Sequence, residues 1–189
     1  MAELIHEIVI TTVSADGTPH IAPMGPRVAP DGHVVLMPFK PSTTLANVLA
    51  TGHAVMNMLT DVRVFAGCVT GRRDWPLVAA EIVAGRRLAC ALAHRELALE
   101  SHTDDVQRPV LRMRVVHQAT HAPFAGFVRA QGAVIEGAVL VSRLSMLPAE
   151  KIDAEMAYLQ IAIDKTAGPV ELEAWGWLRE AVRRHRGEA

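Results

Sequence analysis

The first 120 residues alternate short apolar runs with turn residues, a pattern typical of β-strands joined by hairpins. Residues 4–13, 19–28 and 33–37 are rich in valine, isoleucine, threonine and other residues of extended chains, which fit a pleated, half-buried surface. Asp-Gly pairs at 16–17 and 31–32 separate them, and such pairs favour hairpin turns. Short strands at this spacing predict a small antiparallel barrel or sandwich.

The stretch that follows, up to residue 120, is predicted to mix short helices with longer strands. Asp74 and Pro76 suit the first turn of a helix, and the region before residue 120 alternates apolar and polar positions as a strand does. The elements predicted here are a helix at 42–50, strands at 54–59, 63–69, 87–102 and 110–120, and a short helix at 74–83.

The periodicity changes near residue 125, where apolar positions begin to recur at helical spacing. Residues 127–146 carry few charges, so most of that helix should be buried. Pro148 begins a second helix, and the Gly-Pro pair at 168–169 ends it and starts a third. We therefore predict an α+β protein, with an antiparallel barrel in residues 1–122 and a helical region in residues 123–189 packed on it.

Composition narrows the class of protein. The chain has 189 residues, of which 50% are hydrophobic and 21% charged, with a net charge of -1; this is a globular composition without the basic face that nucleic acids require. No run approaches the roughly 20 apolar residues that cross a bilayer. The first 14 residues lack the basic region and cleavage site of a signal peptide. Cys68 and Cys90 have no CxxC spacing and are expected to be reduced. We expect a soluble, cytoplasmic protein.

Residues 38–48, PFKPSTTLANV, contain the first candidate site. Three consecutive hydroxyl residues, Ser42, Thr43 and Thr44, open the predicted helix, and Lys40 lies two positions before them. A helix N-terminus presents unpaired N–H groups and a partial positive charge, which suit an anion. With these hydroxyls and the lysine it could hold a phosphate monoester. The alternative is that Ser42 or Thr43 only caps the helix.

Two asparagines and a turn could extend this site. Asn57 stands in an otherwise apolar strand, and a buried amide needs partners: either backbone groups or the polar edge of a planar heterocycle. Asn47 lies one helical turn after Thr43 and can face the same side. Thr60 and Asp61 follow the strand directly and form either a turn with an Asx-type bond or another part of a ligand site.

The histidines do not predict a metal site. His117 and His121 are four positions apart, with His94 and His102 upstream, but the Ala-Pro pair at 122–123 breaks any helix there, so helical i, i+4 spacing does not apply. No acidic residue recurs nearby at a ligand spacing. Since neither the ligand number nor the geometry of zinc or iron is indicated, we predict no metal. Nucleotide-loop and nucleophile motifs are also missing from the sequence, and no catalytic residue is predicted.

Four blocks of the sequence, in this order, resemble the DUF447 family. They are DGTPHIAPMGPRV, PFKPSTTLANV, AVMNMLTDVRVFA and FVRAQGAVIEGAVLVSRLSML, and the resemblance covers nearly the whole chain. It implies the FMN-binding split-barrel fold, an antiparallel split β-barrel, here with a C-terminal α-helical annex. The wider split-barrel group includes flavin reductases and pyridoxamine phosphate oxidases, which are usually homodimers with FMN at the subunit interface.

The resemblance also implies roles for individual residues. In similar reductases an S-x-T-x-x-N stretch, which begins at Ser42 here, holds the FMN phosphate, and an asparagine on the next strand, here Asn57, approaches the flavin. Met24 and Gly25 would lie near the isoalloxazine ring. The residues assigned to the cofactor by pattern and resemblance together are Met24, Gly25, Lys40, Ser42, Thr43, Thr44, Asn47, Asn57, Thr60 and Asp61.

The sequence therefore predicts an FMN-binding, homodimeric flavoprotein oxidoreductase. It would resemble a flavin or pterin reductase that uses a nicotinamide donor and a small-molecule acceptor, with the flavin supplying the electron chemistry. One alternative is a protein that holds FMN or another phosphorylated ligand without catalysis. Another is an interaction module without flavin, in which Arg129, Glu136 and Arg143, spaced seven apart on one helical face, make dimer contacts; otherwise these three face solvent.

Overall fold

The structure is a computed structural model that describes residues 4–187. Residues 1–14, which the sequence analysis judged not to be a signal peptide, begin with three residues that lie outside the described part of the chain. Contacts between residues divide the chain into two compact units. Of the described residues, 4–59 and 75–124 form the first unit, and 60–74 and 125–187 form the second.

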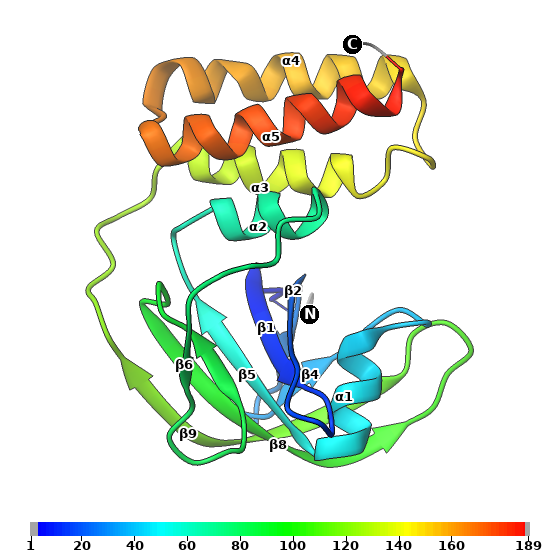
Figure 1. Cartoon of the computed structure of the whole chain (residues 1–189), viewed down its shortest axis with the longest axis vertical. Helices are drawn as coiled ribbons and strands as arrows, with labels where there is room; N and C mark the ends of the chain where they lie inside the picture. The colour runs from blue at the N-terminus through cyan, green and yellow to red at the C-terminus, as the bar shows by residue number, and fades with distance from the viewer. Residues whose placement is uncertain (1–3, 188–189) are drawn as a thin grey trace. The chain divides into compact units, whose positions relative to one another are not determined.

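The first unit is built on an antiparallel sheet that curls into a half-barrel (Figure 1). Within the described residues, seven strands form this sheet in the order β2-β1-β5-β8-β9-β4-β3, and β6 pairs with β7 in a separate hairpin. The strands are β1 (Ile8–Val13), β2 (Pro19–Met24), β3 (Arg27–Val28), β4 (Val34–Leu36), β5 (His53–Met58), β6 (Leu77–Ala79), β7 (Arg86–Leu88), β8 (Ala93–Thr103) and β9 (Val110–Thr120).

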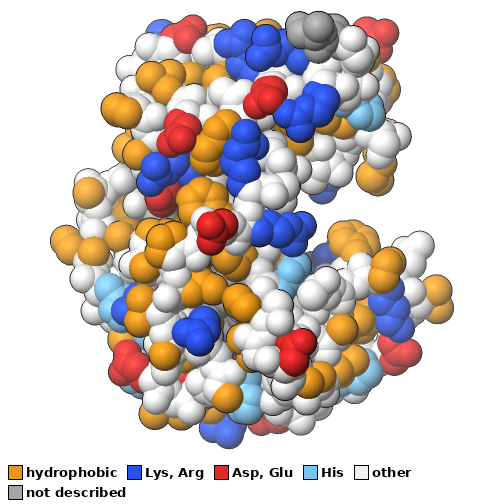
Figure 2. All heavy atoms as spheres, viewed as in Figure 1, with side chains coloured by type: hydrophobic (Ala, Val, Ile, Leu, Met, Phe, Trp, Pro, Cys, Tyr) orange, Lys and Arg blue, Asp and Glu red, His pale blue; other side chains and the backbone are white. Residues whose placement is uncertain are grey.

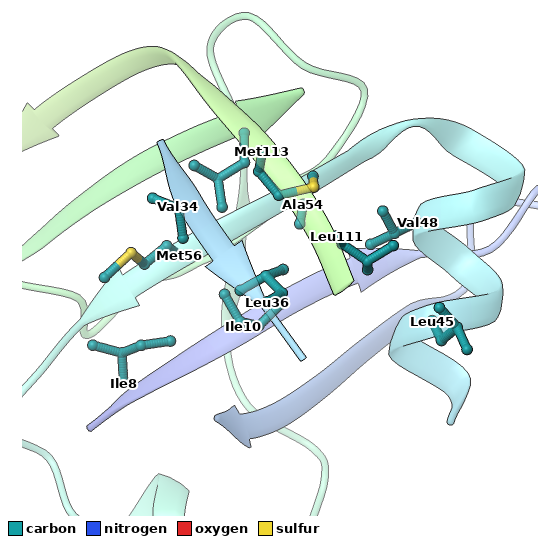
Figure 3. Packing of buried hydrophobic residues seen from close by; sticks show 11 residues of the cluster. Ile8, Ile10, Val34, Leu36, Leu45, Val48, Ala54, Met56, Leu111 and Met113 are labelled. Carbon is teal, nitrogen blue, oxygen red and sulfur yellow. The ribbon is translucent and has the colours of Figure 1, made fainter. Parts of the chain in front are cut away.

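The apolar core of this unit lies between the curled sheet and helix α1 (Thr43–Thr51). Figure 3 shows side chains from β1, β4, β5, β9 and α1 pointing toward one another. Burying such aliphatic side chains contributes roughly 1.5–3 kcal/mol each, so this core fixes where α1 lies against the strands. The cluster consists of Ile8, Ile10, Val34, Leu36, Leu45, Val48, Ala54, Met56, Leu97, Leu111 and Met113.

The second unit is helical. Helices α3, α4 and α5 lie side by side, and α2 contacts α3 and α5 (Figure 1). The predicted junction between the last two helices is confirmed, since Pro169 begins α5 and the Glu171 carboxylate accepts the N–H of Gly168 at 3.0 Å. The helices are α2 (Arg63–Val69), α3 (Arg129–Val141), α4 (Ala149–Thr166) and α5 (Pro169–His185).

Helix α3 packs tightly against α5 at Gly137. A Cβ atom added at Gly137 would lie 2.8 Å from Trp175 Cζ3 and 3.1 Å from Leu178 Cδ1. We expect Gly137→Ala to lower the free energy of unfolding by about 1–2 kcal/mol, because overpacking outweighs the better helix propensity of alanine. Gly132→Ala in the same helix, where a Cβ meets nothing within 4 Å, is the control and should stabilise. Urea unfolding of both variants measures the difference, and equal stabilities would contradict it.

Three predicted elements are wrong. Residues 63–69 form the helix α2 instead of a strand, because Asp61 accepts the N–H of Arg63 at 3.2 Å and the apolar side chains are buried in the helical unit, which overrides the strand preference of valine. Residues 74–83 contain strand β6 instead of a helix, since their backbone pairs with β7. Residues 87–102 are divided between β7 and β8.

Three bulk expectations can be compared with the structure. Within residues 4–187, no helix is both long and apolar enough to cross a membrane. On the face of the molecule shown in Figure 2, acidic and basic side chains are intermixed. Among the described residues, neither Cys68 nor Cys90 forms a disulfide bond, which agrees with the prediction of reduced cysteines.

Candidate functional site

The first turn of α1 carries backbone N–H groups of the kind that bind anions. Ser42 caps the helix, because its Oγ accepts the N–H of Leu45 at 3.3 Å, so the predicted capping role is confirmed. Within residues 4–187, the backbone N–H groups of Thr43 and Thr44 donate to no acceptor. Thr43 is exposed and Thr44 is buried. Capping therefore satisfies one donor and leaves two at the positive end of the helix dipole.

Lys40, two residues before the cap, already has an anionic partner. Its ammonium forms an ion pair with the carboxylate of Asp104, which lies on the loop after β8. The hydrogen bond from Lys40 lowers the pKa of Asp104. The structure therefore shows Lys40 engaged with a carboxylate of the protein.

Asn47 and Thr12 connect α1 to the sheet. The Asn47 side chain is buried, and its Nδ2 donates to Thr12 Oγ1 on β1 at 3.0 Å. This amide therefore fixes the helix against β1. Of the residues predicted to lie near the flavin ring, Met24 packs against the core at the end of β2, and Gly25 is exposed beside it.

Asn57 is completely buried in β5 and bonded on both sides of its amide. Its Nδ2 lies within 3.2 Å of three acceptors, Val9 O, Thr11 Oγ1 and Val55 O, and its Oδ1 accepts the N–H of Leu88 at 2.8 Å. Of the two kinds of partner considered for this amide, the structure supplies backbone groups. These bonds attach strand β7 to β1 and β5.

Thr60 and Asp61 belong to the second unit. The Asp61 carboxylate binds the guanidinium of Arg63 through two contacts, Oδ1 to Nε at 2.9 Å and Oδ2 to Nη2 at 2.7 Å. It also accepts the backbone N–H of Arg63. The turn with a local aspartate bond, one of the two alternatives for this pair, is therefore present in the structure.

A second polar cluster, which the sequence did not indicate, lies on β8. Glu96 is fully buried, and its carboxylate accepts the N–H groups of Glu81, Ile82 and Val83 at 2.6, 2.8 and 2.7 Å. Burial acts to raise the pKa of Glu96, but these three bonds and one from His94 outweigh it and lower the pKa to about 2. Glu96 is therefore an anion that holds the turn between β6 and β7.

Three histidines form a cluster with this carboxylate. His94 is buried, with Nε2 3.2 Å from Glu96 Oε1 and Nδ1 2.9 Å from His121 Nε2. His117 stands opposite Glu96 in the β8–β9 register. Helical spacing was the wrong test for His117 and His121, because residues four apart on a strand point to the same face. His102 lies far along β8, opposite Leu111.

The architecture defines the fold: the curled antiparallel sheet is that of a split β-barrel. The FMN-bound protein MM1853 from Methanosarcina mazei aligns over 95% of this chain and 96% of that chain, with a TM-score of 0.80 and 22% identity. The 2-nitrobenzoate 2-nitroreductase NbaA of Pseudomonas fluorescens aligns over 61% and 65%, with a TM-score of 0.52 and 19% identity. Nitrilotriacetate monooxygenase component B from Bacillus cereus aligns over 70% and 78%, with a TM-score of 0.52 and 17% identity. These likenesses confirm the predicted α+β split barrel with a helical C-terminal region.

The chain belongs to the DUF447 family. The model described as the N-terminal domain of the protein of unknown function DUF447 matches residues 6–122, and a second DUF447 model matches residues 128–180. The family resemblance drawn from the sequence is thereby confirmed. No curated protein matches this chain.

Proposed function

We propose that this protein is an FMN-binding flavoprotein that acts as an oxidoreductase. The observation that carries the proposal is the first turn of α1, where two backbone N–H groups without acceptors, in the described residues, stand beside hydroxyl groups and Lys40. This is chemistry suited to a phosphate monoester. Support comes from MM1853, a structure of the same family and fold that is described as FMN-bound.

The phosphate would be bound at the start of α1. Thr43 and Thr44 supply their N–H groups, Ser42 and Thr43 supply hydroxyls, and Lys40 supplies a positive charge on exchanging Asp104 for the phosphate. Bonds to a charged group are about twice as strong as neutral ones, so these donors can dominate the affinity.

The rest of the proposed cofactor site follows from the family resemblance. Met24 and Gly25 would flank the isoalloxazine ring. Asn47 and Asn57, whose amides are already bonded within the protein, would hold α1 and β5 in place around the cofactor. Thr60 and Asp61 remain predicted cofactor contacts on the same grounds.

Catalysis is the finer part of the proposal. Bound FMN would take a hydride from a nicotinamide donor and pass electrons to a small acceptor of the flavin or pterin class. Oxidation of NADH or NADPH by the FMN-loaded protein, faster than by the same concentration of free FMN, tests this. An unchanged rate with FMN tightly bound would favour the alternative, a protein that holds FMN without catalysis.

We also propose that the protein is a homodimer with FMN at the subunit interface, as is usual in the split-barrel group. Sedimentation equilibrium with and without FMN measures the oligomeric state. A monomer that binds FMN with full affinity would contradict the interface location.

Thr43→Ala is expected to weaken FMN binding by roughly 10–100-fold, because a hydrogen bond to a charged group contributes about 1.5–3 kcal/mol. Thr43 is exposed, so the fold should be unaffected. Quenching of flavin fluorescence during titration gives the Kd, and Ser101→Ala, an exposed hydroxyl on β8, is the control. Equal affinities for the two variants would place the phosphate elsewhere. Before both titrations, the visible absorption spectrum of the protein is recorded after FMN is added and the sample is desalted. Retained flavin bands are expected.

A further inference from the structure

Potential metal ligands from three segments converge on one face of the β8–β9 pair, apart from the start of α1. The donor atoms of Glu81, His94 and His117 all lie within 4.8 Å of one another. Glu81 comes from the turn between β6 and β7, His94 from β8 and His117 from β9. Convergence of two imidazoles and a carboxylate from three segments is a donor set that transition metals favour.

His117 carries the observation that points to a ligand. Its Nε2 is buried and lies 3.1 Å from Glu81 Oε2, yet within residues 4–187 it makes no hydrogen bond of acceptable geometry. A buried ring nitrogen that faces a carboxylate without a hydrogen bond of good geometry can be satisfied by an ion or a water molecule between the two groups. The neighbouring carboxylate favours a cation.

The orientation of the His94 ring is fixed by neighbouring side chains, as is usual for histidines that bind metals. A neutral imidazole has one N–H and one lone pair; with Glu96 beside one ring nitrogen and His121 beside the other, one nitrogen can bond to the protein while the other offers its lone pair. A carboxylate bonded to a ligating histidine is the usual outer support of a metal site. Glu96 also binds the N–H of Glu81 and so positions the carboxylate ligand as well.

We propose that Glu81, His94 and His117 bind a divalent transition-metal ion of the zinc type. Tetrahedral zinc, with bonds of about 2.0–2.2 Å, separates its donor atoms by about 3.3 Å. The donor atoms of the three residues lie within 4.8 Å of one another, so they would have to move closer on binding. The exposed Glu81 side chain can close the remaining distance. The ion would fasten the β6–β7 turn to β8 and β9.

Zinc binding to the full-length protein tests the site. The protein is prepared without a histidine tag, stripped with a chelator, and titrated with Zn²⁺ by calorimetry in a Cys90→Ser background, which removes the exposed thiol. We expect one Zn²⁺ per chain, a higher Tm on binding, and visible bands of tetrahedral Co²⁺ on substitution. His117→Ala and Glu81→Gln, both at positions that are not fully buried, should each weaken binding by at least about tenfold.

His33→Ala is the matched control. His33 Nε2 is likewise buried without a hydrogen bond of acceptable geometry and faces a carboxylate, that of Glu100. The difference is that His33 Nδ1 is 3.0 Å from the Arg112 guanidinium, which would repel a cation. The affinity of the His33→Ala variant for Zn²⁺ should equal that of the parent protein. Absence of Zn²⁺ binding, or equal binding by the parent protein, His117→Ala and Glu81→Gln, would overturn the site. Since the titration needs no FMN, its result is independent of the proposed flavin function.

Discussion

Glu96→Ala is expected to lower the free energy of unfolding by about 3–5 kcal/mol. The substitution removes a buried carboxylate and leaves the N–H groups of Glu81, Ile82 and Val83 without their acceptor, and each buried unsatisfied donor costs about 1–3 kcal/mol. The estimate lies at the low end of their sum because the turn can open to water. Urea unfolding followed by circular dichroism gives the value.

Glu100→Ala provides the control on the same strand. Glu100 is 43% exposed and pairs with Arg112 and His33 at the surface, and such pairs contribute about 0–1 kcal/mol. Glu96→Gln should lie between the two, because the amide keeps one oxygen as an acceptor but replaces the other with a donor group. If Glu96→Ala loses no more stability than Glu100→Ala, the turn is not held by this carboxylate.

Elements whose residues carry local signals were predictable. Ser42 caps α1 as its side chain and position indicate, and the Gly-Pro pair at 168–169 separates α4 from α5. The Asp-Gly pairs lie in the turns that join β1 to β2 and β3 to β4, where Gly17 and Gly32 have φ values of 86° and 87°. In each case the chemistry that sets the local conformation is within a few residues.

Elements held by distant partners were not predictable. Residues 63–69 have the valines of a strand but are buried as a helix among α3 and α5, which local propensity does not register. The β6–β7 hairpin depends on Glu96, which follows Val83 by 13 positions. A single sequence does not indicate which buried carboxylate will accept a turn's N–H groups.

The candidate sites also contain a part that local sequence predicts and a part that depends on residues far apart in the chain. The hydroxyls of 42–44 are adjacent in sequence, so their grouping at a helix start could be predicted, whereas the pairing of Lys40 with Asp104 joins residues 64 positions apart. The histidine cluster was rejected because its spacing was compared with that of a helix, whereas His94 and His117 lie on strands. The alternation His94-x-Glu96, with both side chains on one face of a strand, was the signal that could have revealed the second cluster.

Asn57→Ala is expected to lower the free energy of unfolding by about 3 kcal/mol, with or without FMN. Asn57 Oδ1 is the acceptor for the N–H of the fully buried Leu88, and its Nδ2 lies within 3.2 Å of two carbonyl groups and a hydroxyl. Truncation leaves that N–H unsatisfied and opens a small cavity, and both effects destabilise the folded state. Urea unfolding of the FMN-free protein measures the loss.

Asn47→Ala is the matched control. In the described part of the chain the side chain of this second buried asparagine makes one hydrogen bond, to Thr12 Oγ1, and its loss should cost about 1 kcal/mol. The comparison separates the two roles considered for Asn57. A bond that holds β7 to β5 acts in the folded protein before any cofactor binds, so the FMN-free variant should already be destabilised. If FMN-free Asn57→Ala were as stable as the parent protein and only its FMN affinity fell, the amide would be a flavin contact, and its bond to Leu88 would not be a source of stability.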